Sequence, residues 1–202
     1  MAKEVIPTEM EQRNALRLSN EESNKLTREC IESALVLLMN DREFSEISIT
    51  DIIRRAGVSR SAYYRNYASK EDVLTNVFHK AADTIISALA DSLTEMNMHK
   101  SYLTIFEKVL EGKIFFEIID KANMVYTFQS TLNEKYLSFV EERTVEEYYR
   151  VLSWIGSILN VIFGWIHRDY KESPEEMARI CCLMVSEEEW RIGAGISWKG
   201  ER

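Results

Sequence analysis

One short stretch of the sequence gathers the side-chain types that contact nucleic acid. Arg60 can present its planar guanidinium group either to O6 and N7 of a guanine or to a phosphate. Ser61 is small enough to let a helix approach the base edges. Tyr64, Arg65 and Lys70 are of the types that bind phosphates. Together these residues could both read bases and hold a DNA backbone.

The same stretch has a positive net charge, although the net charge of the whole chain is negative. Residues 48–70 contain five basic residues and one acid, Asp51, a net charge of +4 in a chain whose total is −8, so the remainder carries −12. A local excess of cations is typical of a DNA-binding surface, although a pI of about 5.1 for the whole chain would not suggest one. On charge alone, a solvated basic face stays the alternative.

Two short helices joined by a tight turn are predicted to position these side chains. Ser48 is a good N-cap with Asp51 three residues later, and Gly57 suits the left-handed backbone that often ends a helix. Ser59 then caps a second helix over residues 60–66. Helices at this spacing form a helix-turn-helix unit, whose second helix enters the major groove.

The segment AGVSRSAYYRNYASKEDVL resembles the signature of the TetR family of transcriptional regulators, and the resemblance extends over about residues 25–93. It implies an all-helical, homodimeric regulator that binds operator DNA, with core positions at Tyr63 and Tyr67. Arg65 stands where the family often has His and Asn66 where an aromatic residue is common, so the operator sequence stays open. The predicted DNA-contacting residues are Ser48, Arg60, Ser61, Ala62, Tyr64, Arg65 and Lys70.

The composition predicts an ordered, all-α protein. Of 202 residues, 46% are hydrophobic and only 7 are Gly and 2 are Pro, so no low-complexity linker is expected. We expect a polar arm at 1–22, a three-helix helix-turn-helix domain at 23–70, a helical bundle for effector binding and dimerisation at 71–188, and a tail at 189–202. The polar N-terminus lacks the apolar segment of a signal peptide, which favours a cytoplasmic protein.

The spacing of apolar residues predicts the longer helices. The first is expected at about residues 23–40, and a second, at about 70–95, runs from the DNA-binding domain into the next domain, followed by a linker at 96–100. The sequence leaves open whether Trp190 and Trp198 of the tail dock on the bundle. The residues expected on the buried face of the first helix are Leu26, Cys30, Ala34 and Leu37 or Leu38.

The second domain is rich in aromatic and Met side chains at helical spacing. Such residues form a core more often than a ligand site, but a bundle built from them can also hold a largely apolar pocket. Both interpretations stay open, and a pocket of this kind would take a small apolar or aromatic effector. The predicted effector-binding residues are Phe106, Phe115, Phe116, Met124, Phe128, Trp154 and Trp165.

The stretch 144–170 is apolar on nearly every side, which predicts a helix that is buried all round. A membrane span is disfavoured because its apolar part, 151–166, has only 16 residues against the roughly 20 needed. One face can pack on the bundle and the other on a second subunit, with Gly156 and Gly164 allowing close approach. SPEE at 173–176 begins the next helix. The predicted dimer-interface residues are Trp154, Ile155, Ile158, Ile162, Met177, Ile180, Cys181 and Met184.

These features favour a repressor that a small effector releases from its operator. The pattern ending in ESPEEMA at 172–178 is similar to a C-terminal domain of TetR-family regulators from Gram-positive bacteria, including a dihydroxyacetone-kinase regulator. One alternative is a second domain that binds a protein partner, as in an adaptor or coactivator. Another is an architectural DNA binder with little sequence preference.

An enzyme is not expected, because the sequence has no nucleophile elbow, phosphate loop or metal-ligand spacing. The three His residues are scattered, and neither a metal nor a cofactor is predicted. The three Cys residues form no CxxC pattern, and adjacent Cys181 and Cys182 leave a redox sensor as a minor alternative.

Overall fold

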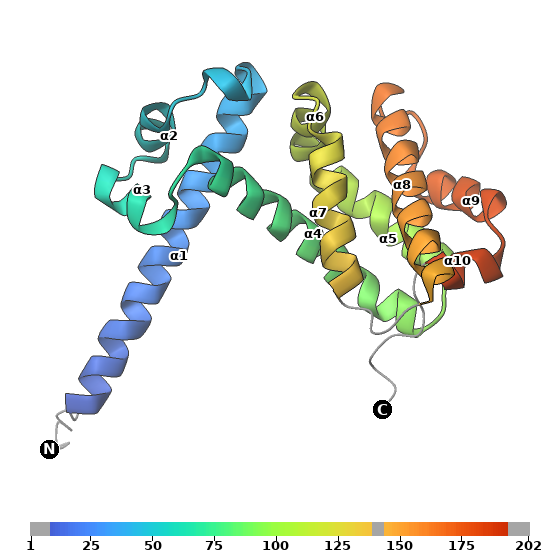
Figure 1. Cartoon of the computed structure of the whole chain (residues 1–202), viewed down its shortest axis with the longest axis horizontal. Coiled ribbons are helices and arrows are strands. Elements are labelled where there is room, and N and C mark those ends of the chain that lie inside the picture. Colours follow the sequence, from blue (N-terminus) through green and yellow to red (C-terminus); the bar gives the residue numbers. More distant parts are fainter. Residues whose placement is uncertain (1–8, 139–143, 194–202) are drawn as a thin grey trace, which may run out of the picture. The chain divides into compact units, whose positions relative to one another are not determined.

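The computed structural model describes residues 9–138 and 144–193, and over these residues the chain is helical and contains no strand (Figure 1). The all-α prediction is confirmed. The chain divides into two compact units, the first ending at Thr75 and the second beginning at Asn76. The helices of the first unit are α1 (Glu9–Asp41), the short 3-10 turn η1 (Phe44–Glu46), α2 (Ile49–Ala56), α3 (Arg60–Asn66) and the start of α4 (Lys70–Thr94). The second unit contains the rest of α4 and α5 (Met98–Glu111), α6 (Lys113–Lys121), α7 (Val125–Ser138), α8 (Val145–His167), α9 (Pro174–Met184) and α10 (Glu187–Gly193).

Helix α1 differs from its prediction in length and in its buried face. It begins at Glu9, inside the segment predicted as a polar arm, and neither Gly nor Pro occurs along it to end the helix earlier. Among residues 21–41 the first buried side chain is that of Ile31, and Leu26, expected in the core, is 62% exposed. Apolar residues at three- and four-residue spacing also form an adjacent face of the helix. Contact with α2 and α3 determines that this adjacent face is the buried one. The residues of α1 buried in the structure include Ile31, Ala34, Leu35 and Met39.

The core of the second unit is built from aromatic rings. Phe128 of α7 is fully buried, and its ring centroid lies 5.6 Å from that of Phe78, 5.7 Å from that of Phe115 and 6.0 Å from that of Phe116. The rings meet edge to face, the arrangement that aromatic quadrupoles favour. Helix α5 packs against α9, and both α7 and α10 pack against α8. Asn97 caps α5, so the predicted linker at 96–100 is too long.

Helix α8 is buried on one side of the chain and exposed on the other. It is long and apolar enough, by length and composition, to pass for a membrane span, although the apolar part identified in the sequence was too short. Half of its most apolar stretch is nevertheless buried inside the chain, as in the core helix of a folded domain. The expectation that α8 is buried all round is therefore wrong for the single chain. The exposed residues on its free side include Ser153, Ser157, Asn160 and Gly164.

The first part of the predicted tail, residues 189–193, belongs to a helix that packs on the second unit. The signal at 173–176 begins α9 with a capping box between Ser173 and Glu176, as expected. Helix α10 then contacts α8 and α5, and Trp190 within it is fully buried. Trp198 lies outside the described residues. The open question about Trp190 is thus answered by its docking on the bundle.

Candidate functional site

Helices α2 and α3 are fixed by the caps that the sequence predicted. The Ser48 hydroxyl accepts a hydrogen bond from the Asp51 backbone N–H (3.2 Å), and the Asp51 carboxylate accepts one from the Ser48 backbone N–H (3.1 Å). Gly57 ends α2 at φ = 67°, in the left-handed region that favours glycine. The Ser59 hydroxyl then accepts a hydrogen bond from the Ala62 N–H (3.1 Å) and caps α3. Local hydrogen bonds at their ends therefore fix where these short helices begin and end.

Helix α3 brings four of the predicted DNA-contacting residues to one exposed face. Arg60, Ser61, Tyr64 and Arg65 are exposed, whereas Tyr63 on the opposite side is fully buried. The Arg60 guanidinium lies over the Tyr64 ring, with Cζ 5.5 Å from the centroid, which holds the side chain along the helix surface. Ala62, also in the predicted set, is half-buried. The face combines a cationic fork, a hydroxyl and a phenol, the groups that bind bases and phosphates.

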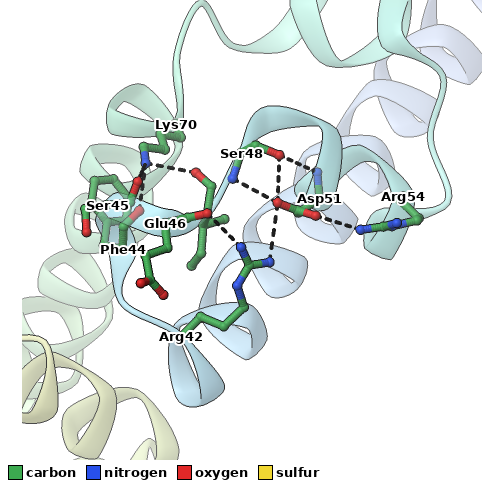
Figure 2. A network of polar contacts seen from close by, with 9 residues as sticks. Arg42, Phe44, Ser45, Glu46, Ser48, Asp51, Arg54 and Lys70 are labelled. Carbon is green, nitrogen blue, oxygen red and sulfur yellow. Dashed lines mark hydrogen bonds and ion pairs between the residues drawn. The ribbon is translucent and has the colours of Figure 1, made fainter.

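The other two predicted DNA contacts, Ser48 and Lys70, lie at the starts of α2 and α4 and form hydrogen bonds within the chain itself. Ser48 is exposed at the start of α2, and its hydroxyl lies 2.7 Å from the Asp51 carboxylate. The Lys70 ammonium group donates hydrogen bonds to the backbone carbonyls of Phe44, Ser45 and Ile47 (Figure 2). Lys70 was expected to face a phosphate. Its role as a DNA contact stays untested, but its donors are bound to carbonyls of the chain itself.

Arg42 is a residue of this site that sequence reasoning missed. Its guanidinium donates to the Glu46 carbonyl at 2.7 Å and lies 3.3 Å from the Asp51 carboxylate (Figure 2). Arg54 lies 2.6 Å from the other oxygen of Asp51. The sequence carried no signal for Arg42, because its position at the end of a helix gives no indication of which carbonyls lie near it.

Folding lowers the pKa of Asp51, the acidic residue of the capping box at the start of α2. Hydrogen bonds from the Ser48 hydroxyl and backbone N–H, together with the charge of Arg42, lower its pKa from 3.8 to about 2. A carboxyl group with a pKa lowered by folding stabilises the folded state when it is ionised. Its contribution is therefore fully present above about pH 4 and is lost as the pH falls towards 2.

Replacing Asp51 with Asn should therefore flatten the acid end of the stability curve. The wild-type urea midpoint, followed by circular dichroism, is expected to fall between about pH 4 and pH 2 by more than that of Asp51→Asn. The two curves should differ most near neutral pH, where only the wild type has the stabilising Asp51 carboxylate. They should converge in acid, because protonation removes that carboxylate from the wild type. Parallel curves over this range would contradict the role of Asp51.

Two side-chain contacts join α1 to the end of α3. The Tyr67 hydroxyl donates to the carboxylate of Glu32, whose side chain is buried on α1. Arg28 of α1 donates to the side-chain oxygen of Asn66 at 3.2 Å. The buried hydrogen bond helps to hold the turn after α3 against α1, because a buried carboxylate group requires hydrogen-bond donors.

We expect Tyr67→Phe to lower the free energy of unfolding by about 1–3 kcal/mol, because it removes a donor from a buried acceptor. Urea denaturation gives the value. Tyr63→Phe is the matched control, since the Tyr63 hydroxyl is buried and has no hydrogen-bond partner among the described residues. Removing that hydroxyl should leave the stability unchanged or slightly raised. Equal losses in the two variants would show that the loss does not come from the Tyr67–Glu32 hydrogen bond.

Most of the residues predicted to bind an effector pack against one another in the core. Phe115, Phe116 and Phe128 belong to the ring cluster described above, and Phe106 meets Trp165 edge to face at 5.3 Å. Met124 is half-buried. A cavity of about 40 Å³ lined by apolar residues touches Phe116 and Trp154, and a larger one of about 230 Å³ touches Trp154 alone of the predicted set.

The larger cavity lies among α5, α8, α9 and α10. Its lining combines polar and apolar residues. The polar ones include Tyr102, Arg150, Ser153, Ser157 and Glu189, and the apolar ones include Ile158, Val161 and Met184. The Trp154 indole N–H donates to the Tyr102 hydroxyl at 3.3 Å, and burial raises the pKa of Tyr102 to about 12. Sequence reasoning missed most of this lining, because it comes from four helices whose contacts no local spacing reveals.

Most residues predicted at the dimer interface lie inside the single chain. Burial leaves only Met184, at 58% exposure, free for a partner, with Ile180 half-buried. The physical reason is that the apolar side of α8 packs on α7 and α10 of its own subunit. The members of the predicted set that are buried in this way are Trp154, Ile155, Ile158, Ile162, Met177 and Cys181.

The described part of the chain gives no support for a redox sensor at Cys181 and Cys182 or for a metal site. Burial raises the pKa of Cys181 to about 12 and also raises that of Cys182, which keeps both thiols in the unreactive protonated form. Across 9–138 and 144–193, no group of three or more His, Cys, Asp or Glu residues is placed to hold a metal ion.

Known proteins are similar to the helix-turn-helix region and also to most of the chain. The family described as bacterial regulatory proteins, tetR family, matches residues 31–77. An uncharacterized HTH-type transcriptional regulator of Bacillus subtilis (strain 168), YxbF, is 23% identical over 188 residues, or 85% of this chain. The chain spans about half (48%) of the length of that relative.

Two solved structures share the fold. A TetR transcriptional regulator from Streptococcus agalactiae 2603V has a TM-score of 0.61 at 17% identity, over 84% of this chain and 99% of its own. A protein assigned to the TetR family, from Syntrophomonas wolfei str. Goettingen, has a TM-score of 0.60 at 20% identity, over 84% and 97% of the two chains. The family match therefore coincides with the capped pair of helices that present Arg60 and Tyr64. Residues 31–77 of this chain are thus similar to the tetR family of bacterial regulatory proteins, and over most of its length the chain has the fold of these two structures.

Proposed function

We propose that the protein is a cytoplasmic repressor that binds a two-fold-symmetric operator as a homodimer. Each subunit would place α3 in a major groove, with half-sites about 34–36 Å apart, or one turn of DNA. The observation that carries the proposal is the exposed face of α3, where Arg60, Ser61, Tyr64 and Arg65 lie together above the buried Tyr63. A rigid capped helix with these groups on one side suits direct reading of bases.

For pairing, the free side of α8 and the end of α9 are the best-supported surface. Small residues along α8 permit close approach of a second helix, and a Cβ added at Gly164 would meet nothing within 4 Å. Leu183 and Met184 of α9 are 76% and 58% exposed and would supply apolar area. This surface replaces the buried residues of the predicted interface.

The effector is proposed to occupy the cavity of about 230 Å³ rather than the closed aromatic cluster. A lining that combines hydroxyl-bearing residues, Arg150 and Glu189 with apolar residues suits a small amphipathic molecule. Ser153 and Ser157 line the cavity and also lie on the free side of α8. An occupant would therefore alter the pairing surface, and with it the spacing of the two α3 helices.

The first test is selection of bound sequences from random duplex DNA at a stated salt concentration. We expect a two-fold-symmetric site and a dimer by analytical ultracentrifugation. No enriched sequence would contradict the proposal and favour a non-specific binder.

The effector is tested by screening small molecules for those that both raise the melting temperature and release the operator. Tyr102→Phe, which removes a lining hydroxyl on α5, away from the proposed pairing surface, should weaken both responses and keep operator binding. If no compound acts in this way, a second unit that binds a protein partner becomes the better interpretation.

A further inference from the structure

Lys70 uses all the hydrogen-bonding capacity of its charged group within the chain. An ammonium group has three N–H donors. Its Nζ lies 2.7 Å from the Phe44 carbonyl, 3.2 Å from that of Ser45 and 2.8 Å from that of Ile47. Nζ also lies 4.6 Å from the centroid of the Phe44 ring. No donor is left for a phosphate while these bonds hold.

The acceptors belong to the turn that leads into α2. Lys70 holds the carbonyls of residues 44, 45 and 47, and Arg42 holds that of Glu46, so a cation binds every carbonyl from Phe44 to Ile47. Figure 2 shows the two cations on this turn, with Ser48 and Asp51 at its end. Ile47 directly precedes Ser48, the residue that caps α2. The position of the α2 N-terminus therefore depends on both cations.

We propose that Lys70 is a positioning residue for operator binding: it orients the turn at 44–47 and the start of α2, and does not neutralise a phosphate. The inference rests on the proposed operator binding by α3, which follows α2 after the turn at Gly57. Removing the ammonium group takes one donor from each of three carbonyls, of which that of Phe44 keeps the hydrogen bond from the Ile47 N–H, and lets the α2 N-terminus move.

Salt dependence separates the two roles. Each phosphate contact adds about 0.9 to the slope of log affinity against log salt. Lys70→Met keeps the length of the side chain and removes its charge. We expect a roughly tenfold weaker affinity for the selected operator at every salt concentration, with the slope unchanged. Arg65→Met, which removes an exposed cation of α3, is the matched control and should lower the slope by about 0.9.

Amide hydrogen exchange in the DNA-free protein supplies a readout that loss of a phosphate contact would not change. Exchange at residues 47–52 should be faster in Lys70→Met and unchanged in Arg65→Met. Arg42→Met is the second variant if Lys70→Met does not fold. It should show the same pattern, because Arg42 holds the remaining carbonyl of the turn.

The affinities are measured on the folded fraction, established by circular dichroism. A slope lowered by about 0.9 in Lys70→Met would establish a phosphate contact and overturn the proposal. A lower melting temperature with unchanged operator affinity would reduce Lys70 to a stabilising residue and overturn it too. The wild-type protein is measured alongside. If it selects no operator, the proposed function itself fails, a result that does not depend on the variants.

Discussion

Replacing Trp190 with Ala is expected to lower the free energy of unfolding by about 3–5 kcal/mol, the largest effect on stability that we predict. Trp190 is fully buried, and its helix α10 packs against α8 and α5. Truncation removes the buried area of the indole and leaves a cavity that the surrounding helices can fill only in part. Urea denaturation followed by circular dichroism measures the change.

The control for Trp190→Ala is Tyr126→Ala on α7. Tyr126 is also a large aromatic residue, but its side chain is 79% exposed, so its loss should change stability by no more than about 0.5 kcal/mol. If Trp190→Ala cost as little as the control, α10 would not be docked on the second unit.

The largest expected effect on DNA binding is that of Arg60→Ala. If Arg60 reads a base, the substitution should cost about 1–3 kcal/mol on the selected operator, roughly a 5- to 150-fold weaker affinity. Preference at one base-pair position should relax, because only a base contact carries sequence information. Quantitative gel shifts on the operator, on single-position variants of it and on random DNA provide the measurement.

Arg65→Ala removes the same charge from the same exposed face of α3 and serves as the control. As a phosphate contact, Arg65 should weaken binding to operator and random DNA alike. An equal loss on both DNAs for Arg60→Ala would refute the base-reading role and leave Arg60 as a second phosphate contact.

The parts of the fold that the sequence predicted well are those that local chemistry decides. Ser48, Ser59 and Ser173 each cap a helix in the structure where the sequence placed a cap, because the donors and acceptors lie within three residues of one another. The spacing of Arg60 and Tyr64 likewise defined one face of α3. A cap or a helical face needs no knowledge of the rest of the chain.

The parts that failed depend on contacts between distant residues. Leu26 and Ile31 are both apolar residues of α1, and only the packing of α2 and α3 against the helix decides which of them is buried. The Lys70 acceptors lie 23 to 26 residues earlier, and no spacing rule links them to a lysine. Aromatic spacing in the second unit could not distinguish rings that pack on each other from rings that line a cavity.

The distribution of tryptophan along the chain has a spectroscopic consequence. All four Trp residues follow residue 150, and the first unit contains none. Intrinsic tryptophan fluorescence therefore reports on the second unit alone, although the proposed DNA contacts lie in the first. A molecule that enters the cavity beside Trp154 should change the emission of the unlabelled protein directly. A change in emission on adding operator DNA would instead show that the second unit responds to an event at α3, so one optical signal can detect both the ligand and the coupling.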